Sequence, residues 1–183
     1  MHVPEQLPQP RHLASILFLL LSVMPPAIGA SDMKLDSVGF RASTSFRGED
    51  ITQGDLFVAH RLPWSWTFSP GWDLATRAEL ALRDLHQEND DGLSASFSTD
   101  LVLSTPLPRV TFNTGVGAGV MEDSVIGDHD LGGPIFFLFH AGSALRLTPI
   151  LSLGYRYGHQ SNGHIYSRNP SLNLHQLELR FSF

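Results

Sequence analysis

The chain has 183 residues, 12 Lys and Arg residues, 18 Asp and Glu residues, a formal net charge of -6 and no cysteine. Without cysteine it has no disulfide, thiolate nucleophile or cysteine-ligated metal. Any catalytic group must therefore be a Ser, a His, a carboxylate or a metal bound without cysteine sulfur. Only 16% of the residues are charged and no stretch is densely basic, so we expect no nucleic-acid partner.

The first thirty residues, 1–30, have the features of a secretory signal peptide. Arg11 precedes an apolar run over residues 13–24, and the small residues Gly29 and Ala30 follow it. The run is shorter than the roughly 20 residues that cross a bilayer as a helix. We therefore expect cleavage after Gly29 or Ala30, with an uncleaved membrane anchor as the alternative.

The remaining residues, 31–183, form one domain in which apolar and polar side chains alternate with period two, which indicates β-strands. The C-terminus is the clearest case, because Leu177, Leu179, Phe181 and Phe183 alternate with polar residues. Eight strands are predicted, at residues 35–46, 54–66, 71–84, 93–104, 110–120, 134–146, 149–159 and 175–183. An even number of strands favours an up-and-down antiparallel barrel.

Charged residues lie opposite the apolar residues of their own strands, so the barrel has one apolar and one polar wall. A soluble barrel buries the apolar wall, whereas a membrane barrel turns it toward lipid and keeps charges in its lumen. Strand lengths of about 10–12 residues, the terminal Phe183 and the aromatic residues Trp64, Trp66 and Trp72 favour the membrane. The predicted lumenal charges are Arg41, Arg61, Arg77, Glu79, Asp100, Arg156, Glu178 and Arg180.

We therefore expect an all-β, eight-stranded antiparallel transmembrane β-barrel in the bacterial outer membrane, with a soluble periplasmic barrel as the alternative. With both termini in the periplasm, the connections after the first, third, fifth and seventh strands reach the cell surface. The long connections at residues 85–92, 121–133 and 160–172 fall at such places, whereas residues 105–108 and 147–148 are short turns. The last hairpin is thus predicted to turn at the cell surface.

That hairpin contains a set of chemically active side chains: His159, Ser161, Asn173 and His175. Strand parity turns all four outward, toward lipid. A His two residues from a Ser on one strand face, with an amide from the neighbouring strand, brings a base, a nucleophile and an orienting group together without a cleft. The substrate of such a site is predicted to be a lipid.

Two motifs accompany this set. His159-x-Ser161-Asn162 is followed by Asn169, and the segment 127–132, Gly-Asp-His-Asp-Leu-Gly, precedes the sixth strand. With the signal peptide, the barrel pattern and the terminal Phe, these motifs make the chain resemble the PagL-type lipid A 3-O-deacylases. Members of that family are eight-stranded outer-membrane barrels whose site lies on the lipid-facing wall.

The resemblance implies a serine esterase, without a cofactor or metal, that removes an ester-linked acyl chain from lipid A and so remodels the outer leaflet. It makes Ser161 the nucleophile and His159 the base that takes its proton. The side-chain amide of Asn162 and backbone N–H groups near Gly163 would stabilise the oxyanion. The family's Glu is replaced by Asn173, which orients a His but stabilises the imidazolium less, so we expect weaker or differently tuned activity.

Other interpretations stay open. Ser161, Asn162 and Gly163 are also ordinary turn residues, which fits a non-enzymatic outer-membrane barrel with a structural or adhesive role. A metal site formed by His159, His164 and His175 is a further alternative, although their spacing matches no common metal site and oxygen ligands are lacking. Lipid A or lipopolysaccharide is the expected partner, and a homodimer is neither required nor excluded by the pattern.

Overall fold

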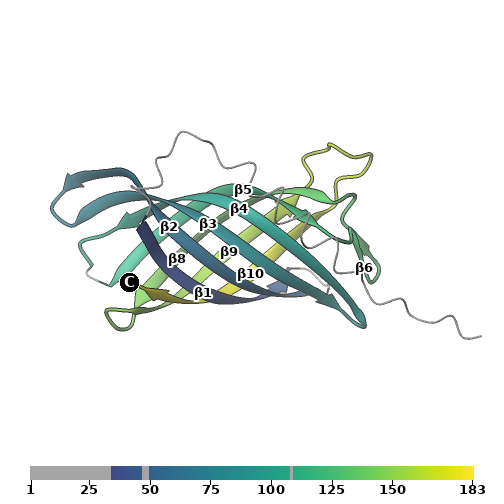
Figure 1. Ribbon diagram of the computed structural model, residues 1–183, viewed down its shortest axis with the longest axis horizontal. Coiled ribbons are helices and arrows are strands. Elements are labelled where there is room, and N and C mark those ends of the chain that lie inside the picture. Colours follow the sequence, from purple (N-terminus) through teal and green to yellow (C-terminus); the bar gives the residue numbers. More distant parts are fainter. Residues whose placement is uncertain (1–33, 47–49, 108) are drawn as a thin grey trace, which may run out of the picture.

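The computed structural model describes residues 34–46, 50–107 and 109–183, so the expected signal peptide at residues 1–30 lies outside the described part of the chain. Eight strands close into an antiparallel barrel, which confirms the predicted all-β fold (Figure 1). Their bounds are β1 (Lys34–Ser45), β2 (Thr52–Ser69), β3 (Trp72–Gln87), β4 (Asp90–Ser104), β5 (Val110–Met121), β8 (Ile135–Arg146), β9 (Leu151–Ser161) and β10 (Ser171–Ser182). No helix among the described residues is long and apolar enough to cross a membrane.

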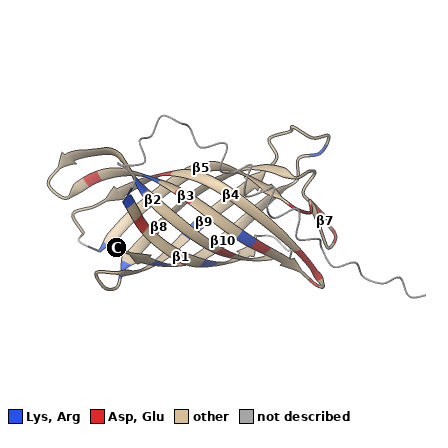
Figure 2. Cartoon of the chain, viewed as in Figure 1, with Lys and Arg blue, Asp and Glu red and all other residues tan. Residues whose placement is uncertain are grey.

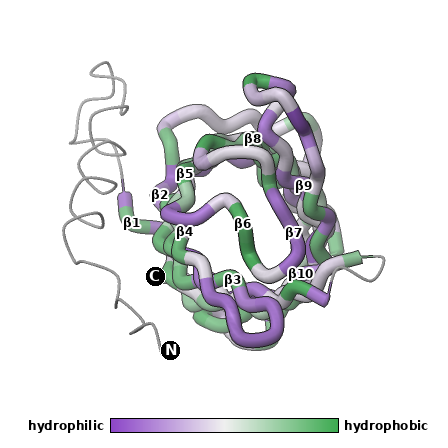
Figure 3. Tube along the Cα trace, turned by 90° about the vertical axis from the view of Figure 1, so that its right-hand side faces the viewer, coloured by the Kyte–Doolittle hydropathy of each residue, from purple (hydrophilic) through white to green (hydrophobic). Residues whose placement is uncertain are grey.

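The barrel closes where β1 pairs with β10, so the strand order is β1-β10-β9-β8-β5-β4-β3-β2. Between β5 and β8, the short strands β6 (Val125–Ile126) and β7 (His129–Asp130) pair with each other. Figure 3 looks into the end of the barrel at which β6 and β7 lie across the opening. This end is opposite the C-terminus, and acidic residues gather at its strand tips (Figure 2).

Large apolar side chains point outward from the barrel wall and are exposed. Leu56, Val116 and Leu177 are 65%, 59% and 60% exposed, whereas the charged side chains of the middle of the barrel are buried inside it. A soluble barrel has the reverse arrangement, with its apolar side chains inside. The distribution of side chains is that of a membrane barrel.

Arg41 lies at the centre of the interior ion pairs. It is fully buried and donates to Glu178 Oε2 at 2.7 Å, to Asp55 Oδ2 at 3.0 Å and to Glu79. Arg180 donates to the other oxygen of Glu178 at 2.8 Å. Buried charges persist only when they are paired and hydrogen-bonded, so this network accounts for charged residues inside a narrow barrel.

The lumenal set predicted from the sequence was wrong at one position and incomplete at two. Arg61 is exposed rather than buried, and Asp55 and Arg83 are buried inside although the prediction omitted them. The register of β2 on β3 shifts between Arg61 and Ser65. Pro63, inside this shift, has no N–H to donate to the ladder. Arg61 itself still pairs with Arg77, and it is exposed at the level of Lys34, where β1 begins.

An apolar cluster fills the interior at the end covered by β6 and β7. Its members are Ile51, Leu85, Met121, Ile126, Leu131, Phe136, Leu138, Leu172 and Leu174. Residues 85–92, predicted as a loop, instead continue β3 and β4 around a turn at Glu88 and Asn89. The loop prediction failed because Leu85 belongs to the cluster and its burial stabilises the extended strands.

The last strand begins earlier than predicted, at Ser171 rather than at His175. Leu172 and Leu174 point inward and are buried in the apolar cluster. Their burial stabilises the extended backbone over residues 171–174, so the strand begins earlier. The loop between β9 and β10 therefore spans only residues 162–170.

Candidate active site

The predicted site residues lie on two neighbouring strands. In the antiparallel register of β9 and β10, His159 is opposite Asn173 and Ser161 is opposite Ser171. Gly158 and the other even-numbered neighbours in β9 are buried in the interior, so His159 and Ser161 project from the outer wall. The structure thus brings the base, the hydroxyl and the amide to one outward face.

His159 and Asn173 are joined by a direct hydrogen bond. His159 Nδ1 lies 2.8 Å from Asn173 Oδ1. Because an amide oxygen only accepts, the imidazole donates through Nδ1–H and keeps a lone pair on Nε2. This is the tautomer in which a His can take a proton from a hydroxyl.

Two tyrosines on the same face of β9 were not singled out by sequence reasoning. The Tyr157 hydroxyl donates to Asn173 Oδ1 at 2.5 Å, and the Tyr155 hydroxyl lies 2.6 Å from His175 Nδ1. The signal was available, because both tyrosines share the parity of His159. Parity does not predict which residue each phenol contacts. Both phenols reach diagonally past the residue directly opposite them in the ladder, Tyr157 to Asn173 and Tyr155 to His175.

His175 lies on the predicted face but one step away from the site. Its ring contacts Phe46 at a centroid distance of 4.9 Å in an edge-on arrangement, and its Nδ1 is paired with Tyr155. The structure therefore separates His175 from the pair formed by His159 and Asn173.

Asn162 is buried, and its side chain is occupied by the loop itself. Its Nδ2 donates to the carbonyl oxygens of Leu131 at 3.2 Å and Arg168 at 2.7 Å, and its Oδ1 accepts from the His164 N–H at 3.0 Å. The Asn162 N–H donates in turn to Asn169 Oδ1 at 2.9 Å. Both amide hydrogens are thus used to connect the hairpin loop to the segment before β8. A direct oxyanion role would require this side chain to release one of its bonds.

The Gly-rich segment before β8 is shaped to receive Asn162. Gly132 has φ +84°, and a Cβ placed on it would lie 2.5 Å from Asn162 Nδ2. Its N–H donates to Asp130 Oδ1 at 2.7 Å, and Asp130 also pairs with the exposed Arg168. The two motifs noted in the sequence therefore form one connected unit.

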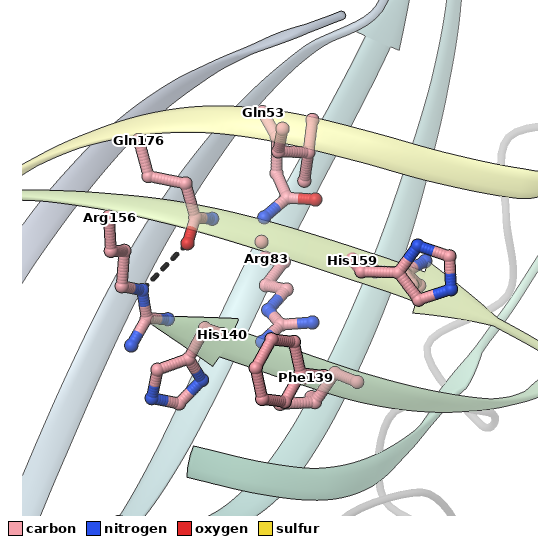
Figure 4. A pocket seen from close by; sticks show the side chains of 11 residues that line it. Gln53, Arg83, Phe139, His140, Arg156, His159 and Gln176 are labelled. Carbon is pink, nitrogen blue, oxygen red and sulfur yellow. Dashed lines mark hydrogen bonds between the residues drawn. The ribbon is translucent and has the colours of Figure 1, made fainter. Parts of the chain in front are cut away.

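A small cavity lies behind the site, inside the barrel. It measures about 20 Å³, and Arg83, His140 and Arg156 point into it while the imidazole of His159 lies to one side (Figure 4). This volume suits a water molecule and is far too small for an acyl chain. The cavity therefore offers no room for a chain of that kind beside His159, whose side chain lies on the outer wall with that of Ser161.

Comparisons with known proteins identify the family and agree with this fold. The model of the lipid A 3-O-deacylase (PagL) family matches residues 52–182. The lipid A deacylase PagL of Bordetella bronchiseptica is 35% identical over 75 residues, which are 41% of this chain and 42% of that protein. The aligned stretch thus spans less than half of the relative's length.

Two solved structures share the architecture. The crystal structure of the outer membrane enzyme PagL has a TM-score of 0.72 at 18% identity, over 80% of this chain and 99% of that one. Neisserial surface protein A has a TM-score of 0.52 at 15% identity, over 85% and 99% of the two chains. At these identities the structures show the fold alone. Since the family model matches most of its length, the chain belongs to the lipid A 3-O-deacylase (PagL) family, as the resemblance of its motifs indicated.

Proposed function

We propose that the protein is an outer-membrane serine esterase that hydrolyses the 3-O-linked acyl chain of lipid A. The observation that carries this proposal is the 2.8 Å hydrogen bond between His159 Nδ1 and Asn173 Oδ1 on the outward face that also holds Ser161. Family membership supports the substrate class. The apolar outer wall supports the membrane location.

The proposal includes an orientation in the membrane. We expect residues 1–30 to export the chain and both ends of the barrel to lie in the periplasm, so that the loop at 162–170, between β9 and β10, turns at the cell surface. His159 and Ser161 then lie at the level of the outer leaflet, where lipid A is embedded. The enzyme acts on a lipid that stays in the membrane and thereby changes the packing of that leaflet.

The reaction follows serine-esterase chemistry. Ser161 Oγ attacks the ester carbonyl carbon while His159 Nε2 takes its proton, and the resulting imidazolium is held by Asn173. Collapse of the tetrahedral intermediate breaks the bond to the sugar oxygen, which takes the proton back from His159. Water, deprotonated by His159, then attacks the acyl-enzyme and releases the fatty acid and free Ser161.

The backbone N–H of Gly163 is the oxyanion donor we assign. Gly163 has φ +64° and follows Ser161 by two residues, at the point where the chain leaves β9. Asn162 acts indirectly, because its bonds to Leu131 and Arg168 fix the backbone that presents this N–H. Preorganised backbone donors stabilise a developing oxyanion strongly at a site that excludes water.

Mass spectrometry of lipid A from cells that produce the protein, Ser161→Ala or Ser171→Ala tests the proposal. Ser171 is the matched control, because it lies opposite Ser161 on the same face. The expected result is loss of one hydroxyacyl chain with the native protein and Ser171→Ala but not with Ser161→Ala. Insertion of each variant is checked by the shift in gel mobility of unheated barrels. An intact acyl pattern with correctly inserted native protein would instead indicate a structural barrel.

A further inference from the structure

Asn173 Oδ1 accepts two hydrogen bonds, both from β9. One comes from His159 Nδ1 at 2.8 Å and the other from the Tyr157 hydroxyl at 2.5 Å. Tyr157 is paired across the ladder with His175, so its phenol reaches diagonally to the amide that faces His159. The amide oxygen is therefore shared between the base and a phenol.

An amide differs from a carboxylate in having two chemically different ends. If the Asn173 side chain rotated by half a turn, its NH₂ group would face His159 Nδ1, which would then have to accept a hydrogen bond. The imidazole proton would move to Nε2, and Nε2 could no longer take the proton of Ser161. A neutral His and an Asn pair equally well in both arrangements, so their own contact does not select the active one.

The phenol of Tyr157 distinguishes the two arrangements. A phenol is a good donor, and Asn173 Oδ1 is its one acceptor among the described residues. In the rotated amide the phenol oxygen could accept from the NH₂ group, but the phenol O–H itself would face lipid without an acceptor, which costs free energy in a medium that offers no water. The phenol thus favours the orientation in which the amide oxygen also faces His159.

We propose that Tyr157 is a positioning residue that sets the tautomer of His159 through the amide of Asn173. The inference rests on the proposed function and explains how an active site without a carboxylate at position 173 keeps a competent base. Tyr155 offers a matched control, because it lies on the same face of β9 but is bonded to His175 instead of Asn173.

The kinetic test combines Tyr157→Phe with Asn173→Asp in a double-mutant cycle on lipid A in detergent micelles. With Asn173, loss of the phenol is expected to lower kcat about tenfold or more and to leave KM within about twofold, because the wrong tautomer cannot act as a base. With Asn173→Asp, the same loss is expected to lower kcat less than about threefold, since both carboxylate oxygens accept equally. Tyr155→Phe should leave kcat near its native value in both backgrounds.

A second readout does not depend on turnover. Nitrogen NMR of ¹⁵N-His-labelled protein reports which imidazole nitrogen carries the proton, with His159→Gln used to assign the signal. We expect Nδ1–H in the native protein and in Tyr155→Phe, and a larger Nε2–H population in Tyr157→Phe.

An unchanged tautomer in Tyr157→Phe, or equal losses of kcat in the Asn and Asp backgrounds, would overturn the inference. Retained deacylation by Ser161→Ala would overturn the proposed function, while the tautomer measurement would still decide the role of Tyr157.

Discussion

His159 of β9 and Asn173 of β10 are direct partners in the barrel ladder, and their side chains meet on its outer wall through a 2.8 Å hydrogen bond. The pair shows how an imidazole and an orienting amide can meet without a cleft, since adjacent strands place opposite side chains within reach. The neutral amide orients the imidazole but adds no negative charge beside it.

Asn173→Glu should therefore increase the rate. A carboxylate accepts the same bond from His159 and also stabilises the imidazolium that forms during attack, so we expect kcat to rise about tenfold. The initial rate of fatty-acid release from lipid A measures the change. Asn173→Leu, which removes the acceptor, should lower the rate, and a rate indifferent to both substitutions would contradict the assigned role.

Asn162→Ala should loosen the surface loop without unfolding the barrel. The substitution leaves the Leu131 and Arg168 carbonyls and the His164 N–H without their partner, and each buried group so affected costs about 1–3 kcal/mol. We expect faster proteolysis within residues 162–170 and reduced kcat. Ser167→Ala, at an exposed position of the same loop, is the control and should be cut at the native rate.

Gly132→Ala should reproduce much of that phenotype. An added Cβ would press on Asn162 Nδ2 and would also strain a backbone with φ +84°, a conformation that costs a non-glycine residue about 1–3 kcal/mol. Because both substitutions disrupt the same contact, the double variant should be cleaved little faster than the worse single variant. Additive effects of the two would mean that Gly132 acts independently of Asn162.

Arg41→Leu should destabilise the barrel strongly. It leaves Asp55, Glu79 and Glu178 without the guanidinium that they share, and breaking a buried pair in this way costs about 3–5 kcal/mol. Urea unfolding of the barrel in lipid vesicles, followed by tryptophan fluorescence, should show a lower midpoint. The exposed Arg61→Leu is the matched control and should unfold near the native midpoint.

Family membership and barrel architecture could both be predicted from the chain because they depend on local patterns. Alternation with period two identifies the outward face of β9 and β10, and this parity already placed His159, Ser161 and Asn173 on one wall. The failures were local as well. Arg61 pairs with Lys34, the first residue of β1, and is exposed there rather than buried in the lumen, and burial of Leu85 and Leu172 extended strands beyond their expected ends.

The sequence by itself determined which side of each strand a residue occupies, because side-chain direction follows from the pleat of the backbone. Only the tertiary structure decided which residues meet across the ladder, since register and closure depend on pairing between distant segments. Arg41 and Glu178 are 137 positions apart and meet because β1 closes on β10. In the same way, packing of strands and loops decides which groups bond to Asn162 and that the Tyr157 phenol contacts Asn173. The alternation of apolar and polar residues along one strand does not encode these contacts.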